Sequence, residues 1–411
     1  MLLDEEFLEA CYQYLTSARP IQSIEHLKGR EKALRQLVEA IDAPGRHAFI
    51  YGDRGVGKTS LAHTGAFQAQ SSQDAPIIVA CDNQSSFSSI CSAIVRRLLD
   101  LNPLETKGYK ISGGIGAFGA SANLGLERPA SKQDIKITDV NDAVYWFRKA
   151  TERINFDPIV IIDEFDLFPI IVEHDHFSGL IKQLSDQCIP IKLIFCGIAD
   201  SLDQLFRAHE STHRYIHAEH LERLTLGKCM EICDDASVGL RIEVPNHLRY
   251  RIAQISDGFP YYVHLVCEKM FRSAHSDKKV AVDQECFDFA INQAIDSIEP
   301  RLKKPYENSV HKNTKNSEPI LWALANDKLL DVQVSNIWRH YDEICATLKI
   351  DKINKANFTT KLNNLSKPQY GEILVKPRRS YYTFNEKMLR GYARLRCARE
   401  GYDPGPENPG A

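Results

Sequence analysis

The chain has 411 residues, of which 43% are hydrophobic, and this is enough to form the buried cores of two or three domains. No apolar run reaches the roughly 18 to 20 residues that span a bilayer, and the acidic start MLLDEEFLEACYQYL is not typical of a signal peptide. We therefore expect a soluble, cytoplasmic protein with no membrane contact.

The net charge of −3 conceals a strong asymmetry. Residues 301–400 carry 20 Lys or Arg against 10 Asp or Glu, whereas residues 1–300 carry 31 against 42. A basic C-terminal part on an acidic body indicates a polyanionic partner such as nucleic acid, although a solvated mixed-charge surface gives the same pattern. The eleven cysteines contain no Cys-x-x-Cys pair, which argues against a zinc ribbon or a redox pair.

Apolar periodicity predicts the elements in chain order. Residues 1–45 predict two helices that lead into a core domain over residues 46–220. In that domain the runs HAFIYG, APIIVACD, DPIVIIDEFD and IKLIFCGIA predict buried strands that alternate with amphipathic helices. Such strands indicate a parallel sheet covered on both faces, with ligands at the carboxyl ends of the strands. The glycine-dense segment 108–125 fits either a short hairpin or a flexible loop.

The remaining chain predicts two smaller parts. Residues 221–300 predict an all-helical region, and the polar run KKPYENSVHKNTKNSEP then predicts a linker. A compact unit follows over residues 317–400. The tail over residues 401–411 has three prolines and three glycines, so we expect it to be disordered.

The segment GDRGVGKT fits G-x-x-x-x-G-K-[ST] directly after an apolar strand and before a helix. Such a loop wraps phosphates with backbone N–H groups at the positive end of the helix dipole. We expect Lys58 to reach the β- and γ-phosphates of a nucleotide and Thr59 to ligate Mg²⁺. The predicted nucleotide-binding residues here are Gly52, Asp53, Arg54, Gly55, Val56, Gly57, Lys58, Thr59 and Ser60.

Polar residues follow the later strands. Asp163 is placed to hold Mg²⁺, and Glu164 to polarise the attacking water as in hydrolytic members of the P-loop superfamily; the alternative for Glu164 is a surface acid beside a turn. Asp200 and Ser201 either sense the γ-phosphate or cap a helix. Arg214 is the preferred candidate, ahead of Arg207 and Arg223, for an arginine finger that completes a neighbouring subunit's site.

The segments HLKGREKALRQLVEAI, GDRGVGKTS, IIDEFD, IFCGIADSL and GFPYYVHLVC together resemble the AAA+/STAND group of P-loop ATPases, and within it the initiator branch of origin-recognition ATPases. The resemblance covers about residues 20–300 and implies ATP and Mg²⁺ as cofactors and a homo-oligomer formed with ATP. It implies that residues 27–31 pass near the adenine, and that Gly258 and Pro260 mark the contact of a helical lid. His264 is either a nucleotide contact in place of the arginine of relatives or a buried structural histidine.

Three predicted helices and a hairpin over residues 317–400 resemble a winged helix, which initiator ATPases commonly carry after the lid. The third helix would enter a major groove with Lys355 and Lys361. The wing VKPRRSYY would reach phosphate with Lys376, Arg378 and Arg379. Many winged helices bind proteins instead.

The sequence thus predicts an α/β fold: a parallel P-loop sheet sandwiched by helices, then an α-helical lid and a winged-helix domain. We expect a slow, partner-stimulated ATPase that acts as a nucleotide-controlled, DNA-binding switch or loader. One alternative is a STAND-like signalling or defence ATPase that senses a ligand and activates a separate effector protein. Transposition or plasmid-maintenance regulation would use the same parts.

Overall fold

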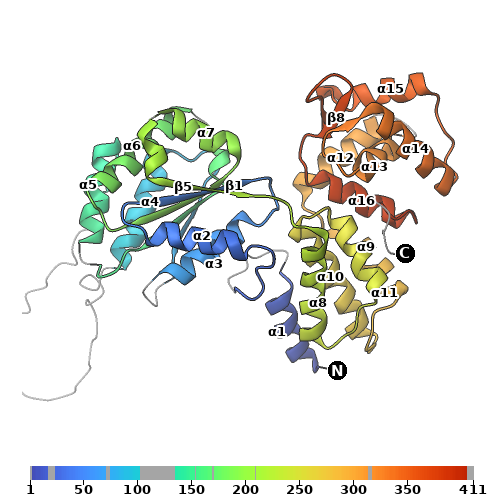
Figure 1. Cartoon of the computed structure of the whole chain (residues 1–411), viewed down its shortest axis with the longest axis horizontal. Helices are drawn as coiled ribbons and strands as arrows, with labels where there is room; N and C mark the ends of the chain where they lie inside the picture. The colour runs from blue at the N-terminus through green and yellow to red at the C-terminus, as the bar shows by residue number, and fades with distance from the viewer. Residues whose placement is uncertain are drawn as a thin grey trace, which may run out of the picture. The chain divides into compact units, whose positions relative to one another are not determined.

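The computed structural model describes residues 2–16, 24–70, 75–101, 135–152, 154–168, 171–208, 210–312 and 317–404. Its contacts divide the chain into two compact units. The sheet unit comprises Lys32–Gly52 and Leu61–His220, and the helical unit comprises Met1–Glu31, Asp53–Ser60 and Leu221–Ala411. Figure 1 shows the elements of both. The glycine-dense segment 108–125 lies outside the described residues.

The sheet unit is built on five strands in the order β2-β3-β4-β1-β5. Every pairing whose register is resolved, β2 with β3, β3 with β4 and β4 with β1, is parallel. This confirms the predicted parallel sheet. The strand bounds are β1 His47–Gly52, β2 Ile77–Ala80, β3 Ile159–Asp163, β4 Lys192–Gly197 and β5 Ile216–Leu221.

Helices cover both faces of this sheet (Figure 1). One layer contains α2 and α3, where Leu37 packs so tightly on Gly65 that a Cβ there would lie 2.6 Å from it. The other layer contains α4 to α7, which share one buried cluster with Val160, Ile162, Leu193 and Phe195 of the central strands. The bounds are α2 Glu31–Asp42, α3 Lys58–Ala69, α4 Phe87–Asp100, α5 Val140–Thr151, α6 Ile171–Asp186 and α7 Ala199–Ala208, with short 3₁₀ turns at η1 Phe165–Leu167 and η2 Glu210–Arg214.

A bundle of helices opens the C-terminal part of the helical unit. Its bounds are α8 Leu226–Leu240, α9 Asn246–Ser256, α10 Pro260–Ser276, α11 Gln284–Ser297 and α12 Pro300–Lys312. The N-terminal helix α1 (Asp4–Tyr14) packs against α8, and the ring of Phe7 stacks on His275 at 3.9 Å. The sequence did not predict that α1 joins this bundle.

Helix α12 corrects one expectation. Residues 303–312 were predicted as part of an irregular linker, but they are helical. The reason is burial of one face: Tyr306 and Ser309 are fully buried, and the Tyr306 ring meets Tyr392 edge-on at 4.8 Å. Polar composition concealed these few inward-facing positions.

The last part is a winged helix, as predicted, with additions. Its bounds are α13 Glu318–Asn326, β6 Val332–Gln333, α14 Val334–Leu348, α15 Lys355–Asn364, η3 Pro368–Tyr370, β7 Leu374–Val375, β8 Tyr381–Phe384 and α16 Leu389–Arg399. The strands form a small antiparallel sheet in the order β6-β8-β7. The sequence did not predict β6 or α16 as separate elements.

Two residues of the predicted disordered tail have defined partners. Asp403 pairs with Arg251 at 2.7 Å, and the Tyr402 hydroxyl accepts a hydrogen bond from Asn326. Residues 405–411 lie outside the described part. Among the helices that the structure describes, none has the length and apolar character needed to cross a membrane.

Candidate functional site

The phosphate-loop sequence connects β1 to α3. Gly55 and Gly57 have φ values of +75° and +97°, a backbone region that glycine adopts without strain. A Cβ on Gly57 would meet no atom within 4 Å, so space is open beside the backbone there. The ammonium of Lys58 donates a hydrogen bond to the Asp53 carbonyl at 3.0 Å, which holds it within the loop. This combination of a curved backbone, open space beside Gly57 and a cation fits a phosphate group.

Arg30 supports this loop from within the helical unit. Its Nη2 donates two hydrogen bonds, one to the Val56 carbonyl at 2.9 Å and one to the Glu222 carbonyl at 2.6 Å. The side chain is buried, so these bonds to carbonyls are shielded from water. The family resemblance implied that residues 27–31 pass near an adenine, but no sequence pattern predicted that Arg30 holds the loop.

The acidic pair at the end of β3 occupies the carboxyl edge of the sheet. Asp163 is half-buried, and its Oδ1 accepts the backbone N–H of Glu164 at 2.9 Å. Glu164 has an exposed side chain and a left-handed backbone with φ of 53°. Because β1, β4 and β3 are parallel neighbours, the end of β1 at Gly52 lies at the same edge as Asp163.

The predicted sensor and finger residues lie on the elements after β4. Asp200 is exposed in the first turn of α7, whereas Ser201 is buried. Arg214 is exposed at the end of η2. Among the described residues, no group of three or more His, Cys, Asp or Glu could hold a metal. The predicted roles of Asp200, Ser201 and Arg214 stay predictions.

The lid turn at Gly258 is tightly packed. Gly258 has φ of +80°, and a Cβ there would lie 2.5 Å from the carbonyl oxygen of Leu224. The Leu224 N–H in turn donates to the Gly258 carbonyl at 2.8 Å. Pro260 is the first residue of α10, where a proline costs no helical hydrogen bond. Only glycine fits this junction, so the lid is fixed to the chain segment just after β5.

His264 lies in the core of the lid. It is buried, and neither ring nitrogen has a hydrogen-bond partner among the described residues. Burial lowers its pKa to about 4, so the ring is neutral near pH 7. These observations favour the structural histidine of the two interpretations, while the predicted nucleotide contact stays untested.

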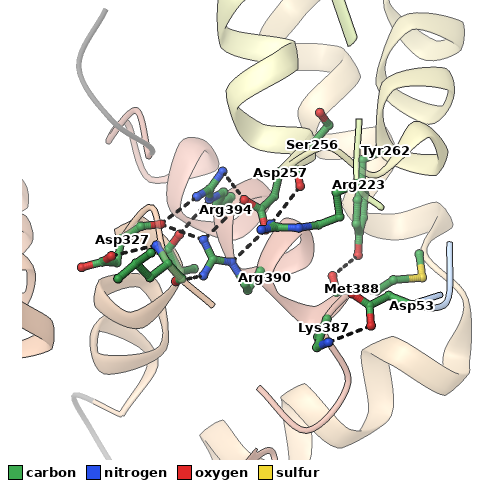
Figure 2. A network of polar contacts seen from close by, with 12 residues as sticks. Asp53, Arg223, Ser256, Asp257, Tyr262, Asp327, Lys387, Met388, Arg390 and Arg394 are labelled. Atoms are coloured by element: carbon green, nitrogen blue, oxygen red, sulfur yellow. Dashed lines mark hydrogen bonds and ion pairs between the residues drawn. The ribbon is translucent and has the colours of Figure 1, made fainter. Parts of the chain in front are cut away.

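A buried ionic cluster surrounds Asp257, the residue before Gly258 (Figure 2). Its carboxylate pairs with Arg223 at 2.6 Å, with Arg390 at 2.8 Å and with Arg394 at 3.0 Å. Burial alone would raise the pKa of Asp257, but the three guanidinium groups hold it below its ordinary value. Arg223, the weaker arginine-finger candidate, thus has an intramolecular partner in this structure.

Arg390 and Arg394, on α16, also bind the end of α13 within the winged helix. Arg390 Nη2 donates to the Asp327 carbonyl at 2.7 Å, and Arg394 Nε donates to the Ala325 carbonyl at 2.8 Å. Helix α16 is therefore fixed both to the lid turn and to the end of α13. Sequence reasoning missed this cluster because LRGYARLRCARE reads as a charged surface segment. The only available signal was the spacing of Arg390 and Arg394, which places them on one helix face.

The predicted DNA-contacting residues lie on α15 and the wing. Lys355 is exposed, and burial lowers the pKa of the half-buried Lys361. Lys376 donates to Asn363 Oδ1 at 2.8 Å, which joins the wing to α15. Arg378 stacks over the Tyr381 ring at 3.8 Å and, like Arg379, is exposed at the wing turn. The structure thus brings α15 and the base of the wing together.

Comparison with protein families matches residues 41–206 to the AAA domain. No curated protein sequence matches the chain. Among solved structures, a Walker-type ATPase of Pyrococcus abyssi is similar with a TM-score of 0.52 and 15% identity, over 92% of this chain and 99% of that one. The ORC2 protein of Aeropyrum pernix, solved as ADPNP–ADP complexes, is similar with a TM-score of 0.51 and 12% identity, over 95% and 98%. At these identities the structural similarity establishes the fold.

Proposed function

We propose that this chain, whose residues 41–206 are an AAA domain of the P-loop type, binds ATP with Mg²⁺ and hydrolyses it slowly. The observation that carries the proposal is the loop Asp53–Ser60, whose left-handed glycines and enclosed Lys58 fit phosphate groups. The ADPNP–ADP complexes of the Aeropyrum ORC2 protein, which shares this fold, support a nucleotide ligand.

The chain's own residues have separate roles in this proposal. Backbone N–H groups and Lys58 bind the phosphates, and Gly258 and Pro260 contact the nucleotide from the lid, with His264 as a further candidate. Asp200 or Ser201 senses the γ-phosphate. Thr59 and Asp163 would hold Mg²⁺, which when bound would neutralise negative charge on the phosphates. Glu164, exposed at the carboxyl edge of the sheet, orients and deprotonates the attacking water.

We further propose that ATP promotes a homo-oligomer in which Arg214 of one subunit completes the site of the next. The position of Arg214 supports this: it is exposed, lies between α7 and β5, and belongs to the sheet unit that carries Glu164. A guanidinium supplied by a neighbour would stabilise the charge that develops on the transferred phosphoryl group. ATP hydrolysis would then cause the oligomer to dissociate.

The winged helix would bind duplex DNA through α15 and the wing. Exposed Lys355, Lys376, Arg378 and Arg379 support this, because cationic side chains on both elements can contact phosphates at once. Together these parts describe a nucleotide-controlled, DNA-binding switch or loader. ATP-dependent oligomers that ignore DNA would instead favour the signalling alternative with a separate effector.

The test measures ATP affinity, ATP turnover and DNA affinity on the full chain. We expect Lys58→Ala to abolish nucleotide binding. Glu164→Gln should retain binding but lose about 100-fold or more in turnover, because the general base is removed. Glu152→Gln, at an exposed position of the same unit, is the matched control and should match the wild type.

Two outcomes would contradict the proposal. ATP hydrolysis that survives Lys58→Ala would show that the loop is not the catalytic site. A DNA affinity that is equal with ATP, with ADP and without nucleotide would rule out the switch.

A further inference from the structure

The turn before α16 contacts the phosphate loop directly (Figure 2). Lys387 Nζ lies 2.8 Å from Asp53 Oδ1. The side chain of Met388 covers Gly55 so closely that a Cβ on that glycine would lie 2.5 Å from the Met388 sulfur. Met388 is only 6% exposed, so its side chain is buried at this contact. A C-terminal segment 334 residues away in sequence therefore covers the loop.

This turn is held in place by the lid. The Tyr262 hydroxyl donates to the Met388 carbonyl at 2.6 Å, and Tyr262 is fully buried two residues after Pro260. Arg390, two residues after Met388, is bound to Asp257 on the other side of the lid turn. The lid turn, the start of α16 and the phosphate loop thus form one junction, within the helical unit. A shift of any of the three must be accommodated by the other two.

The charges at this junction have a consequence for anion binding. Asp53 places a carboxylate in a loop whose proposed ligand is a polyphosphate, and like charges at short range repel. Lys387 neutralises that carboxylate from outside the loop. Both side chains are about one-third exposed, at 39% and 30%, so solvent screens the pair and its effect is moderate.

We propose that Lys387 and Met388 couple the C-terminal domain to nucleotide binding: the docked turn favours nucleotide in the loop, and bound nucleotide favours the docked turn. This rests on the proposed function of the loop as the ATP site. Lys387 acts as a positioning residue through Asp53. The coupling is reciprocal, because a contact that strengthens nucleotide binding must itself be strengthened by the nucleotide. Binding or loss of nucleotide would thereby change how firmly the winged helix is docked, within one subunit.

The experiment is a double-mutant cycle on the full chain, with a fluorescent ATP analogue as the probe. We expect Lys387→Ala to raise the Kd about three- to tenfold. Asp53→Asn is the reference of the cycle, whatever its own Kd. Asp53→Asn with Lys387→Ala should lie within about twofold of Asp53→Asn, because the charge to be neutralised is gone. Lys304→Ala, an exposed lysine on α12, is the matched control for loss of one positive charge.

Hydrogen exchange supplies the second readout. In the wild type, the analogue should slow exchange in peptides covering residues 385–394, and Lys387→Ala should reduce this protection. Equal Kd values for the wild type and Lys387→Ala, with no nucleotide effect on residues 385–394, would overturn the coupling. A wild type that binds no analogue would instead overturn the proposed ATP site, so the two failures are distinguishable.

Discussion

The sheet unit and the helical unit fill their interiors differently. In the sheet unit, the centre of the core is aromatic: Phe165 meets Phe177 and Phe195 edge-on at ring distances of 5.3 and 5.0 Å. In the helical unit, a carboxylate and two guanidinium groups are buried together at Asp257, Arg390 and Arg394. Apolar contacts tolerate small changes of geometry, whereas buried charges are stable only when every partner is present.

This difference indicates that the helical unit depends more than the sheet unit on a specific set of side-chain contacts. The hydrophobic pattern and strand propensity of neighbouring residues are enough to specify the sheet. The junction of lid, α16 and phosphate loop requires Arg390 and Arg394 to face Asp257, a residue that lies more than 130 positions earlier. Our hypothesis is that the ionic cluster specifies how the winged helix docks on the lid.

The largest expected effect comes from removing the shared carboxylate. Asp257→Ala leaves Arg390 and Arg394 buried without a counter-charge, which should lower the free energy of unfolding of the helical unit by about 3–5 kcal/mol. Asp234→Ala removes a partly exposed partner of Arg249 and should cost only about 0–1 kcal/mol. Urea-dependent hydrogen exchange of α16 and β4 peptides measures each unit separately. Equal losses in both peptides would break the contrast between the units.

A buried histidine in each unit should make stability depend on pH. The pKa of His264 is lowered to about 4 by burial, so between pH 6.5 and about 4 only the unfolded chain takes up this proton. Stability is full above that window and should fall by about 3 kcal/mol as the pH drops through it. His264→Leu should flatten the profile of α10, and the exposed His247→Gln should not. A profile that His264→Leu leaves unchanged would count against a neutral buried ring.

His47 gives the same measurement in the sheet unit. Burial lowers its pKa to about 3, and its Nδ1 accepts the Leu193 N–H at 3.1 Å. Replacing His47 also removes that hydrogen bond, so His47→Leu should lower the free energy of unfolding near pH 7. It should also weaken the fall of that free energy as the pH drops below 6.5. Since His264 has no hydrogen-bond partner among the described residues, His264→Leu reports only the effect of a buried neutral ring on stability, whereas His47→Leu also reports the loss of a hydrogen bond.

The smallest effect is expected at the exposed wing. Arg378→Ala and Arg379→Ala should each weaken duplex DNA binding several-fold, and each should reduce the slope of log affinity against log salt by about 1 if it contacts a phosphate. Lys304→Ala is the control. Fluorescence anisotropy over a salt series measures both quantities, and folding should be unaffected because these side chains are exposed. Unchanged slopes in both variants would indicate that the wing binds something other than a phosphate backbone.

Much of the fold could be predicted because its signals are local. The runs HAFIYG and DPIVIIDEFD carry their strand character in consecutive residues, and the loop GDRGVGKT needs glycines at fixed positions for its backbone. Gly258 is a similar case, since its left-handed backbone and close packing admit no side chain. The winged helix was predictable from the spacing of its helices and the hairpin, confirmed by β7 and β8.

The rest depended on contacts that no local pattern encodes. Tyr306 and Ser309 belong to a polar run, yet they are buried because α12 packs against α16 and η3. Lys387 resembles any solvated lysine until the fold places it on Asp53.

By itself, the sequence determined the parallel sheet, the phosphate loop and the basic winged helix, because backbone conformation and hydrophobic periodicity are properties of neighbouring residues. Only the tertiary structure decided that α1 joins the lid bundle, that Asp257 gathers three arginines, and that Lys387 and Met388 cover the loop. The physical reason is that a charged side chain acquires its role from the partners and burial that packing provides. Those partners lie between 34 and 334 positions away in the chain.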